Sequence, residues 1–115
     1  MDANIARDNS LLLNFNAETS TIILGKKDMD NGTVAPVNIF TDEEAIALMK
    51  TLLGKDEKPG AMTAIINWDY SRGKDKTILL IGQKDPITPE LKVLNVLKGG
   101  DVFDLIKKLL GKDNL

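Results

Sequence analysis

Short apolar runs alternate with turn residues along this chain, and an amphipathic stretch follows them. The whole pattern occurs twice, once in each half of the chain. Residues 11–16 and 63–69 are rich in strand-forming residues, and residues 20–27 and 77–84 follow them after a turn. Runs of this composition joined by turns of a few residues are typical of β-hairpins. The pattern therefore predicts one hairpin near the start of each half of the chain.

A third apolar run follows each predicted hairpin, at residues 33–40 and 91–98. The second run has an alternative interpretation as a helix, because Thr88-Pro89-Glu90 resembles a helix start and three leucines follow at helical spacing. In the first half, Pro36 and a Val-Asn-Ile-Phe run favour an edge strand over a helix. By analogy between the halves, we predict a strand at both places.

Both hairpins include a run that is apolar at consecutive positions, Ile22-Ile23-Leu24 in the first half and residues 78–81 in the second. A strand exposed on one face usually alternates apolar and polar residues, whereas a strand buried on both faces does not. The two runs therefore predict central strands that are covered on both sides.

Each half ends in a stretch with apolar residues at helical spacing. Thr41-Asp-Glu-Glu44 has the form of a capping box, and Asp101 is the expected N-cap in the second half. Gly54 and Gly111 are placed to end the helices in the left-handed conformation. The expected buried faces are Ala45, Leu48, Met49, Leu52 and Leu53 in the first helix and Val102, Phe103, Leu105, Ile106, Leu109 and Leu110 in the second.

The two halves also match residue by residue. At an offset of 57, residues 20–56 and 77–113 are identical at 11 of 37 positions, including Gly-x-Lys-Asp and a terminal Leu-Leu-Gly-Lys-Asp. Upstream the offset is 53, because the second hairpin is longer by four residues. Self-similarity at a fixed period indicates repeated supersecondary units.

These patterns predict an α+β fold in a single domain, residues 1–115. It would be a tandem duplication of a βββα unit with pseudo-two-fold symmetry, a mainly antiparallel sheet packed against two amphipathic helices. Repeat one would span residues 11–57 and repeat two residues 61–115, after an N-terminal extension of residues 1–10. The pattern leaves open whether the helices share one sheet or cover two.

Composition and charge narrow the function classes. With 43% hydrophobic and 28% charged residues the chain is typical of globular proteins, and no apolar run approaches the roughly 20 residues that span a bilayer. Its first residues have no apolar segment typical of a secretory signal, which favours a cytoplasmic location. Residues 1–57 contain 5 basic and 10 acidic residues and residues 58–115 contain 10 and 7, so the second half is the more positive.

The sequence lacks both histidine and cysteine. This excludes Ser-His-Asp and Cys-His catalysis and zinc sites built from those residues, and the usual phosphate-binding motifs are absent as well. Asp28 and Asp85 are equivalent positions that would hold a cation only if the two halves met there, and a turn role is favoured. We therefore predict no enzymatic activity, no cofactor and no metal.

The lengthened second hairpin is the most suggestive candidate site. If strand alternation continued through its turn, one face would carry Trp68, Tyr70, Arg72, Lys74 and Lys76. Aromatic residues continuing into a basic stripe would stack bases and contact phosphates, as in single-stranded nucleic-acid binders. The alternative, which the residue pattern favours, places Trp68 in the core beside Ala64 and Ile66.

The function predicted from sequence is a small, non-catalytic binding protein that acts through protein–protein contact, either with a partner or with a second copy of itself. Small size, the lack of catalytic side chains and few aromatic residues favour this class. Single-stranded nucleic-acid binding through residues 68–76 is the alternative.

Overall fold

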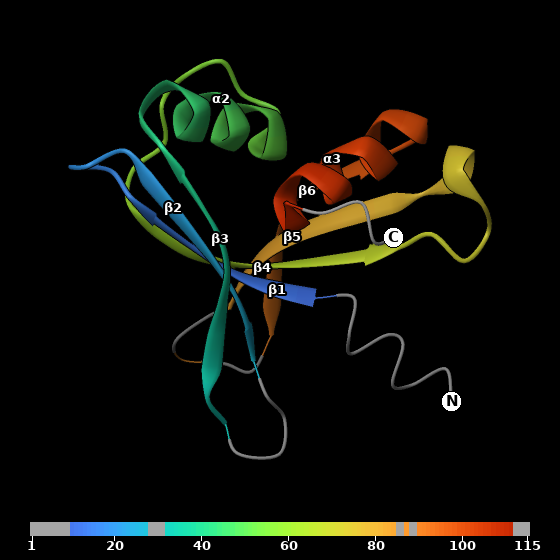
Figure 1. Cartoon of the computed structure of the whole chain (residues 1–115), viewed down its shortest axis with the longest axis horizontal. Helices are drawn as coiled ribbons and strands as arrows, with labels where there is room; N and C mark the ends of the chain where they lie inside the picture. Colours follow the sequence, from blue (N-terminus) through green and yellow to red (C-terminus); the bar gives the residue numbers. More distant parts are fainter. Residues whose placement is uncertain (1–9, 28–31, 85–86, 88–89, 112–115) are drawn as a thin grey trace.

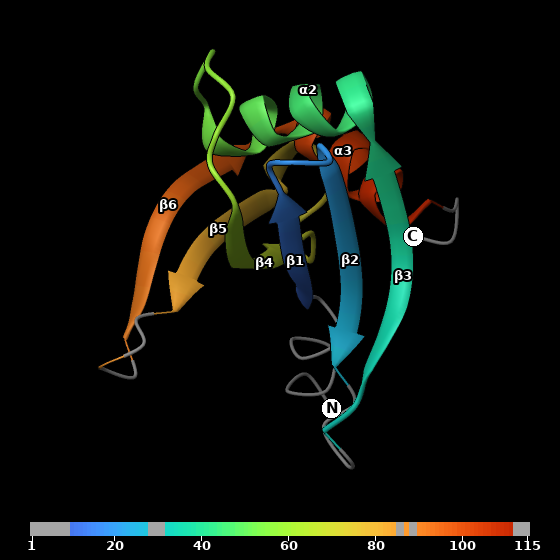
Figure 2. The same ribbon diagram turned by 90° about the vertical axis from the view of Figure 1, so that its left-hand side faces the viewer.

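The computed structural model describes residues 10–27, 32–84, 87 and 90–111. Six strands form one antiparallel sheet in the order β3-β2-β1-β4-β5-β6, and both helices lie on the same side of it (Figures 1 and 2). The elements are β1 (Ser10–Asn16), β2 (Thr21–Lys27), β3 (Val34–Thr41), α2 (Asp42–Leu53), β4 (Met62–Asp69), the short 3-10 helix η1 (Lys74–Lys76), β5 (Ile78–Lys84), β6 (Leu91–Lys98) and α3 (Gly100–Leu110). The α+β class, the antiparallel sheet and the strand at residues 91–98 are confirmed.

The first half and the second half of the chain meet at the centre of the sheet. β1 pairs with β4 in antiparallel register, with Leu12 opposite Ile65 and Leu13 opposite Ala64. Alternate residues of these strands point to opposite faces, so this register places the buried residues of both halves on one face. α2 and α3 cover that face.

The core lies between the sheet and the two helices. From the strands it takes Leu11, Leu13, Phe15, Ile22, Leu24, Phe40, Ala64, Ile66, Trp68, Leu79 and Ile81. From the helices it takes Ala45, Leu48, Met49, Leu52, Val102, Ile106 and Leu109. The predicted helical faces are therefore the buried ones, with Leu53, Phe103, Leu105 and Leu110 half-buried at their borders.

The prediction that residues 22–24 and 78–81 are covered on both sides is wrong. Ile23 is 48% exposed and Leu80 is half-buried, because no element of the described chain packs on the second face of the sheet. Both helices are needed on the first face to bury the alternating residues there. The second face is left open.

Both edge strands carry a bulge at the same place. The register shifts between Leu24 and Gly25 where β2 meets β3, and between Ile81 and Gly82 where β5 meets β6. The extra residues, Val37 and Leu94, are half-buried against the core. Each glycine leaves room for a side chain from the edge strand, since a Cβ at Gly25 would lie 2.5 Å from Val34 Cγ1. The bulges bend the edge strands over the glycines.

Two asparagines connect the halves. Asn95 of β6 donates a hydrogen bond from Nδ2 to the carbonyl of Leu52 in α2, at 3.0 Å. Asn38 of β3 donates to the carbonyls of Leu109 and Lys108 in α3, at 3.3 and 3.4 Å. These acceptors are among the last carbonyls of each helix, which lack the usual partner four residues on. The Lys108 carbonyl also accepts from the N–H of Gly111. Each helix is thus fastened to the edge strand of the other half.

The C-terminal ends of both helices agree with the sequence prediction, whereas their N-terminal caps do not. Gly54 and Gly111 adopt the left-handed conformation, both with φ of 68°, as predicted. Thr41 is the N-cap of α2 but its side chain makes no capping hydrogen bond, so the capping box is not formed. The prediction of Asp101 as N-cap is also wrong, because α3 begins at Gly100 after Gly99.

At each helix start that differs from the prediction, a backbone hydrogen bond joins the chain to the preceding hairpin. The N–H of Asp42 donates to the carbonyl of Ser20 at 2.8 Å, and that of Gly99 donates to the carbonyl of Thr77 at 2.9 Å. Both donors have positive φ, 54° at Asp42 and 116° at Gly99. The chain therefore enters each helix through a turn fastened to the preceding hairpin, which removes the need for a side-chain cap.

Substituting Gly25 by alanine tests the close approach at the bulge. The new Cβ would meet both the Val34 side chain and the Ala35 carbonyl oxygen, the latter at 3.3 Å. We expect Gly25→Ala to lower the free energy of unfolding by about 1–3 kcal/mol through overpacking. Gly60→Ala is the control, because nothing lies within 4 Å of its Cβ position. Equal urea midpoints for the two variants would contradict the packing described.

Substituting Asn95 tests the connection between β6 and α2. Asn95→Ala removes a half-buried hydrogen bond and should cost about 1 kcal/mol in urea denaturation. Asn95→Asp keeps the shape but places an acceptor against the Leu52 carbonyl, so it should cost more than alanine. An aspartate variant as stable as the wild type would show that the amide does not donate there.

Candidate functional site

The structure separates the five residues of the predicted basic stripe. Trp68 points into the core and is 7% exposed, Tyr70 is half-buried, and the three basic residues are exposed. The strand alternation that would align them ends at Asp69, and η1 forms a tight turn in place of a continued ribbon. The second hairpin therefore brings no row of aromatic and basic side chains to one face.

Trp68 belongs to the core in the same manner as Phe15 of β1, which is 1% exposed. Its indole Nε1 is buried and makes no hydrogen bond within the described part of the chain. A buried ring of this kind contributes packing area and is not available to stack on a base. The placement agrees with the core interpretation of Trp68 that the residue pattern favours.

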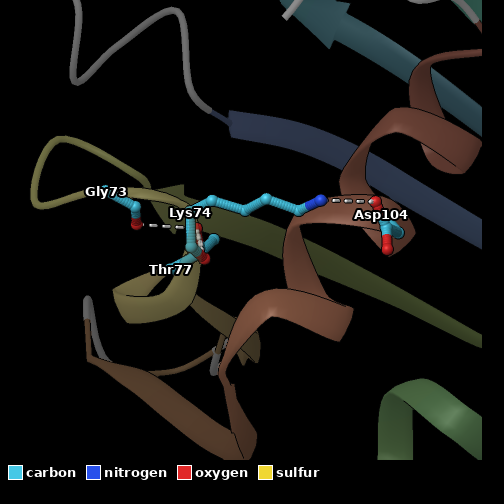
Figure 3. A network of polar contacts seen from close by, with 4 residues as sticks. All are labelled: Gly73, Lys74, Thr77 and Asp104. Carbon is cyan, nitrogen blue, oxygen red and sulfur yellow. Dashed lines mark hydrogen bonds and ion pairs between the residues drawn. The ribbon is translucent and has the colours of Figure 1, made fainter.

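Tyr70 and Lys74 contact α3. The Tyr70 ring meets the Phe103 ring edge to face, with centroids 6.0 Å apart. The Lys74 ammonium lies 3.8 Å from an Asp104 carboxylate oxygen (Figure 3). It also lies 5.7 Å from the Phe103 centroid. The Lys107 ammonium lies 6.0 Å from the same ring. These contacts fasten the long hairpin to the second helix.

Hydrogen bonds within the turn hold its shape. The buried Thr77 hydroxyl donates to the Lys74 carbonyl at 2.8 Å and to the Gly73 carbonyl at 3.3 Å (Figure 3). The Ser71 side chain and backbone N–H donate to the Asp69 carboxylate, which with the nearby Arg72 lowers the pKa of Asp69. Asp69 is therefore ionised at neutral pH.

Acidic side chains are interleaved with the basic ones on this hairpin. Asp69 and Asp75 belong to the same segment as the three basic residues, and Asp104 is the ion-pair partner of Lys74. A phosphate backbone is bound mainly through an excess of positive charge. The small local excess here is a weak basis for nucleic-acid binding.

A larger candidate surface lies on the opposite side of the sheet, which we call the open face. It includes these uncharged strand residues, whose side chains point away from the helices: Leu12, Asn14, Ile23, Gly25, Val34, Pro36, Ile39, Thr63, Ile65, Asn67, Ile78, Leu80, Gly82, Leu91, Val93 and Val96. The register also places Lys27 opposite Val34 and Lys84 opposite Leu91 on this face. Asp69 and Lys98 flank Ile78 at one end of the face.

Large apolar side chains on the open face are exposed to an unusual degree. Ile39 is 55% exposed, Val34 and Val93 are 51% exposed, and Ile23 is 48% exposed. Isolated apolar residues on a surface are ordinary, but a contiguous set of this kind marks an interaction site. The open face is therefore the strongest candidate functional surface of the described chain.

The open face is not flat. A hollow of about 340 Å³ lies beside β1, lined by Leu12, Leu13, Asn14, Ile23, Gly25, Val34, Pro36 and Thr63. Glycine makes the hollow possible, since Gly25 adds no side chain between Leu12 and the edge strand. A projecting apolar side chain of a partner would fit there.

The sequence contains the apolar residues of this surface but does not indicate that they stay uncovered. Consecutive apolar residues at 22–24 and 78–81 were interpreted as strands buried on both faces. Two helices of eleven or twelve residues, however, are enough to cover only one face of a six-stranded sheet. The apolar residues of the second face are therefore not covered by any element of the described chain.

Within the residues that the structure describes, no three His, Cys, Asp or Glu residues are grouped to hold a metal ion. No helix in the described ranges has the length and apolar character to cross a membrane. Asp28, Asp85 and most of the N-terminal extension lie outside the described residues. Comparisons with protein-family models, curated proteins and solved structures find no match for this chain.

Replacing Trp68 tests its assignment to the core. Trp68→Phe removes the unpartnered indole N–H and retains most of the ring, so the free energy of unfolding should change by about 1 kcal/mol or less. Trp68→Ala should cost about 3–5 kcal/mol because it leaves a cavity. A phenylalanine variant as unstable as the alanine variant would show that the indole nitrogen has an essential partner.

Proposed function

We propose that this protein is a non-catalytic binding module that docks other protein surfaces through its open face. The observation that carries the proposal is a contiguous set of exposed apolar residues around an uncharged central row of the open face, Pro36, Gly25, Leu12, Ile65, Gly82 and Val93. The charged positions of this face, Lys27, Asp69, Lys84 and Lys98, lie outside that row. The cores of protein–protein interfaces show the same depletion of charge.

The chemistry of the open face favours protein over nucleic acid. The polar residues beside its central row include Asn14, Thr63 and Asn67, whose side chains carry no charge. A nucleic-acid backbone would require lysine or arginine at these positions. Single-stranded nucleic-acid binding through residues 68–76 is the alternative, and the burial of Trp68 removes the strongest reason for it.

The lack of histidine and cysteine supports the non-catalytic part of the proposal, because the commonest nucleophile and acid–base pairs need one of them. A binding role needs neither residue, because it depends on surface shape and apolar contact.

We also infer that the chain arose by tandem duplication of one βββα unit. The support is that several contacts recur at an offset of 57. The bonds from Asn38 to Leu109 and from Asn95 to Leu52 exchange equivalent residues, and the helix-entry bonds from Asp42 and Gly99 do the same. The two bulges, beside Gly25 and Gly82, are a third such pair. A duplicated chain would present a docking face made of two similar halves.

Site-specific photo-crosslinking in the cells that make this protein tests the docking face. A benzophenone side chain at Ile39 or Val96, both exposed on the open face, should yield crosslinked adducts of defined mass. The same probe at Ala47, which is exposed on α2, should yield none. Adducts at Ala47 alone, or at no position, would overturn the proposal.

The nucleic-acid alternative has its own measurement. Single-stranded oligonucleotide is titrated at low and moderate salt, and binding is followed by mobility shift. The proposal predicts no shift. A salt-sensitive shift that Arg72→Ala and Lys74→Ala both weaken would replace the protein-binding proposal, whereas Ala47→Lys serves as a charge control on the helical side.

A further inference from the structure

We propose that the partner on the open face is a second copy of this chain, stacked sheet to sheet in a two-fold symmetric dimer. The inference rests on the proposed docking role of the open face and adds the identity of its occupant. Four observations support it: the area of the face, its uncharged central row, the arrangement of its residues and its shape.

The area is sufficient for a stable dimer. The sheet has six strands of seven or eight residues. With strands about 4.8 Å apart and a rise of about 3.3 Å per residue, the face covers about 700 Å² per copy. Two copies would bury about 1,400 Å², within the roughly 1,200–2,000 Å² of specific interfaces. A short peptide would cover only part of this area.

The uncharged central row favours a partner with the same surface. Two identical faces bring like charges together wherever a charge lies near the symmetry axis, and like charges in contact oppose association. The row through Leu12 and Ile65 has no such charge, and the charged positions Lys27, Asp69, Lys84 and Lys98 lie in the rows on either side of it. Two copies can therefore meet along their central rows without like charges at the axis.

The arrangement of residues favours a symmetric partner. One row across all six strands reads Pro36, Gly25, Leu12, Ile65, Gly82, Val93. The row has two large residues at its centre, a glycine on each side and an apolar residue at each edge. A partner that matches the whole face presents two similar halves. A second copy has such halves because it has the same sequence.

Shape supports the same conclusion. The sheet is twisted, with β3 and β5 running in clearly different directions in Figure 1. Twisted sheets pack face to face, either nearly aligned or nearly orthogonal, at a separation of about 10 Å. The hollow beside Gly25 would accept an apolar side chain of the facing copy, with Leu12 and Ile65 at the centre of the contact.

The test is sedimentation velocity of the full chain over a range of concentrations, with two matched variants. Asn14→Asp adds a charge to the open face at an exposed position, with almost no change in shape. Ala47→Glu adds the same charge to the exposed side of α2. We expect a dimer whose dissociation constant rises at least tenfold in Asn14→Asp and is unchanged in Ala47→Glu. Thermal melts of both variants verify that the fold is retained.

A chemical crosslink gives an independent readout, because the chain has no cysteine of its own. Asn14→Cys should be joined into dimers by a short bismaleimide, and Ala47→Cys should remain monomeric under the same conditions. A dimer that tolerates Asn14→Asp but is lost in Val93→Pro would overturn the proposal in favour of pairing along the β6 edge.

The outcomes separate this inference from the proposed function. A chain that stays monomeric at all concentrations, yet crosslinks to a different protein from Ile39 and Val96, overturns the second copy and leaves the docking role in place. A monomeric chain without crosslinks at those positions overturns both. A dimer weakened by Asn14→Asp alone supports both.

Discussion

The antiparallel pairing of β1 with β4 is the constraint on which the rest of this structure depends. It joins the two halves into one sheet, and its register sets Leu13 opposite Ala64 on the side of the helices and Leu12 opposite Ile65 on the other. A shift of one residue in either strand would send the buried side chains of that half to the wrong face. Because both halves bury the same side, α2 and α3 share one face. The openness of the second face follows from this single register.

Much of the fold was predictable because it depends on local chemistry. The strand pattern, the amphipathic faces and the left-handed glycines Gly54 and Gly111 are all properties of short segments. The helix starts were not predictable, because the Ser20 and Thr77 carbonyls that receive the entry bonds lie more than twenty residues away. The Thr-x-x-Glu motif that begins at Thr41 has the sequence of a capping box, but its capping hydrogen bond is not formed. The start of this helix is held instead by the backbone hydrogen bond from Asp42 to Ser20.

The candidate site shows the same division. The core placement of Trp68 could be predicted because Ala64 and Ile66 lie at alternate positions before it on the same strand. All three residues are buried. The open face could not be predicted from the sequence. A run such as Ile22-Ile23-Leu24 has the same composition whether its second face is covered by the same chain or by another one. Sequence periodicity reports that a side chain needs burial, and it does not report which molecule supplies it.

The divergence between the halves bears on which surface is functional. The second hairpin differs from the first in length and charge, and its distinctive residues Tyr70 and Lys74 contact α3. Their effect is to hold the longer hairpin against its helix, which is a structural role. The open face, by contrast, keeps apolar residues in both halves, as at Ile39 and Val96 or Val34 and Leu91, where solvent would favour polar ones. Exposed apolar area promotes association, so its presence on both halves supports the proposed partner that would cover both.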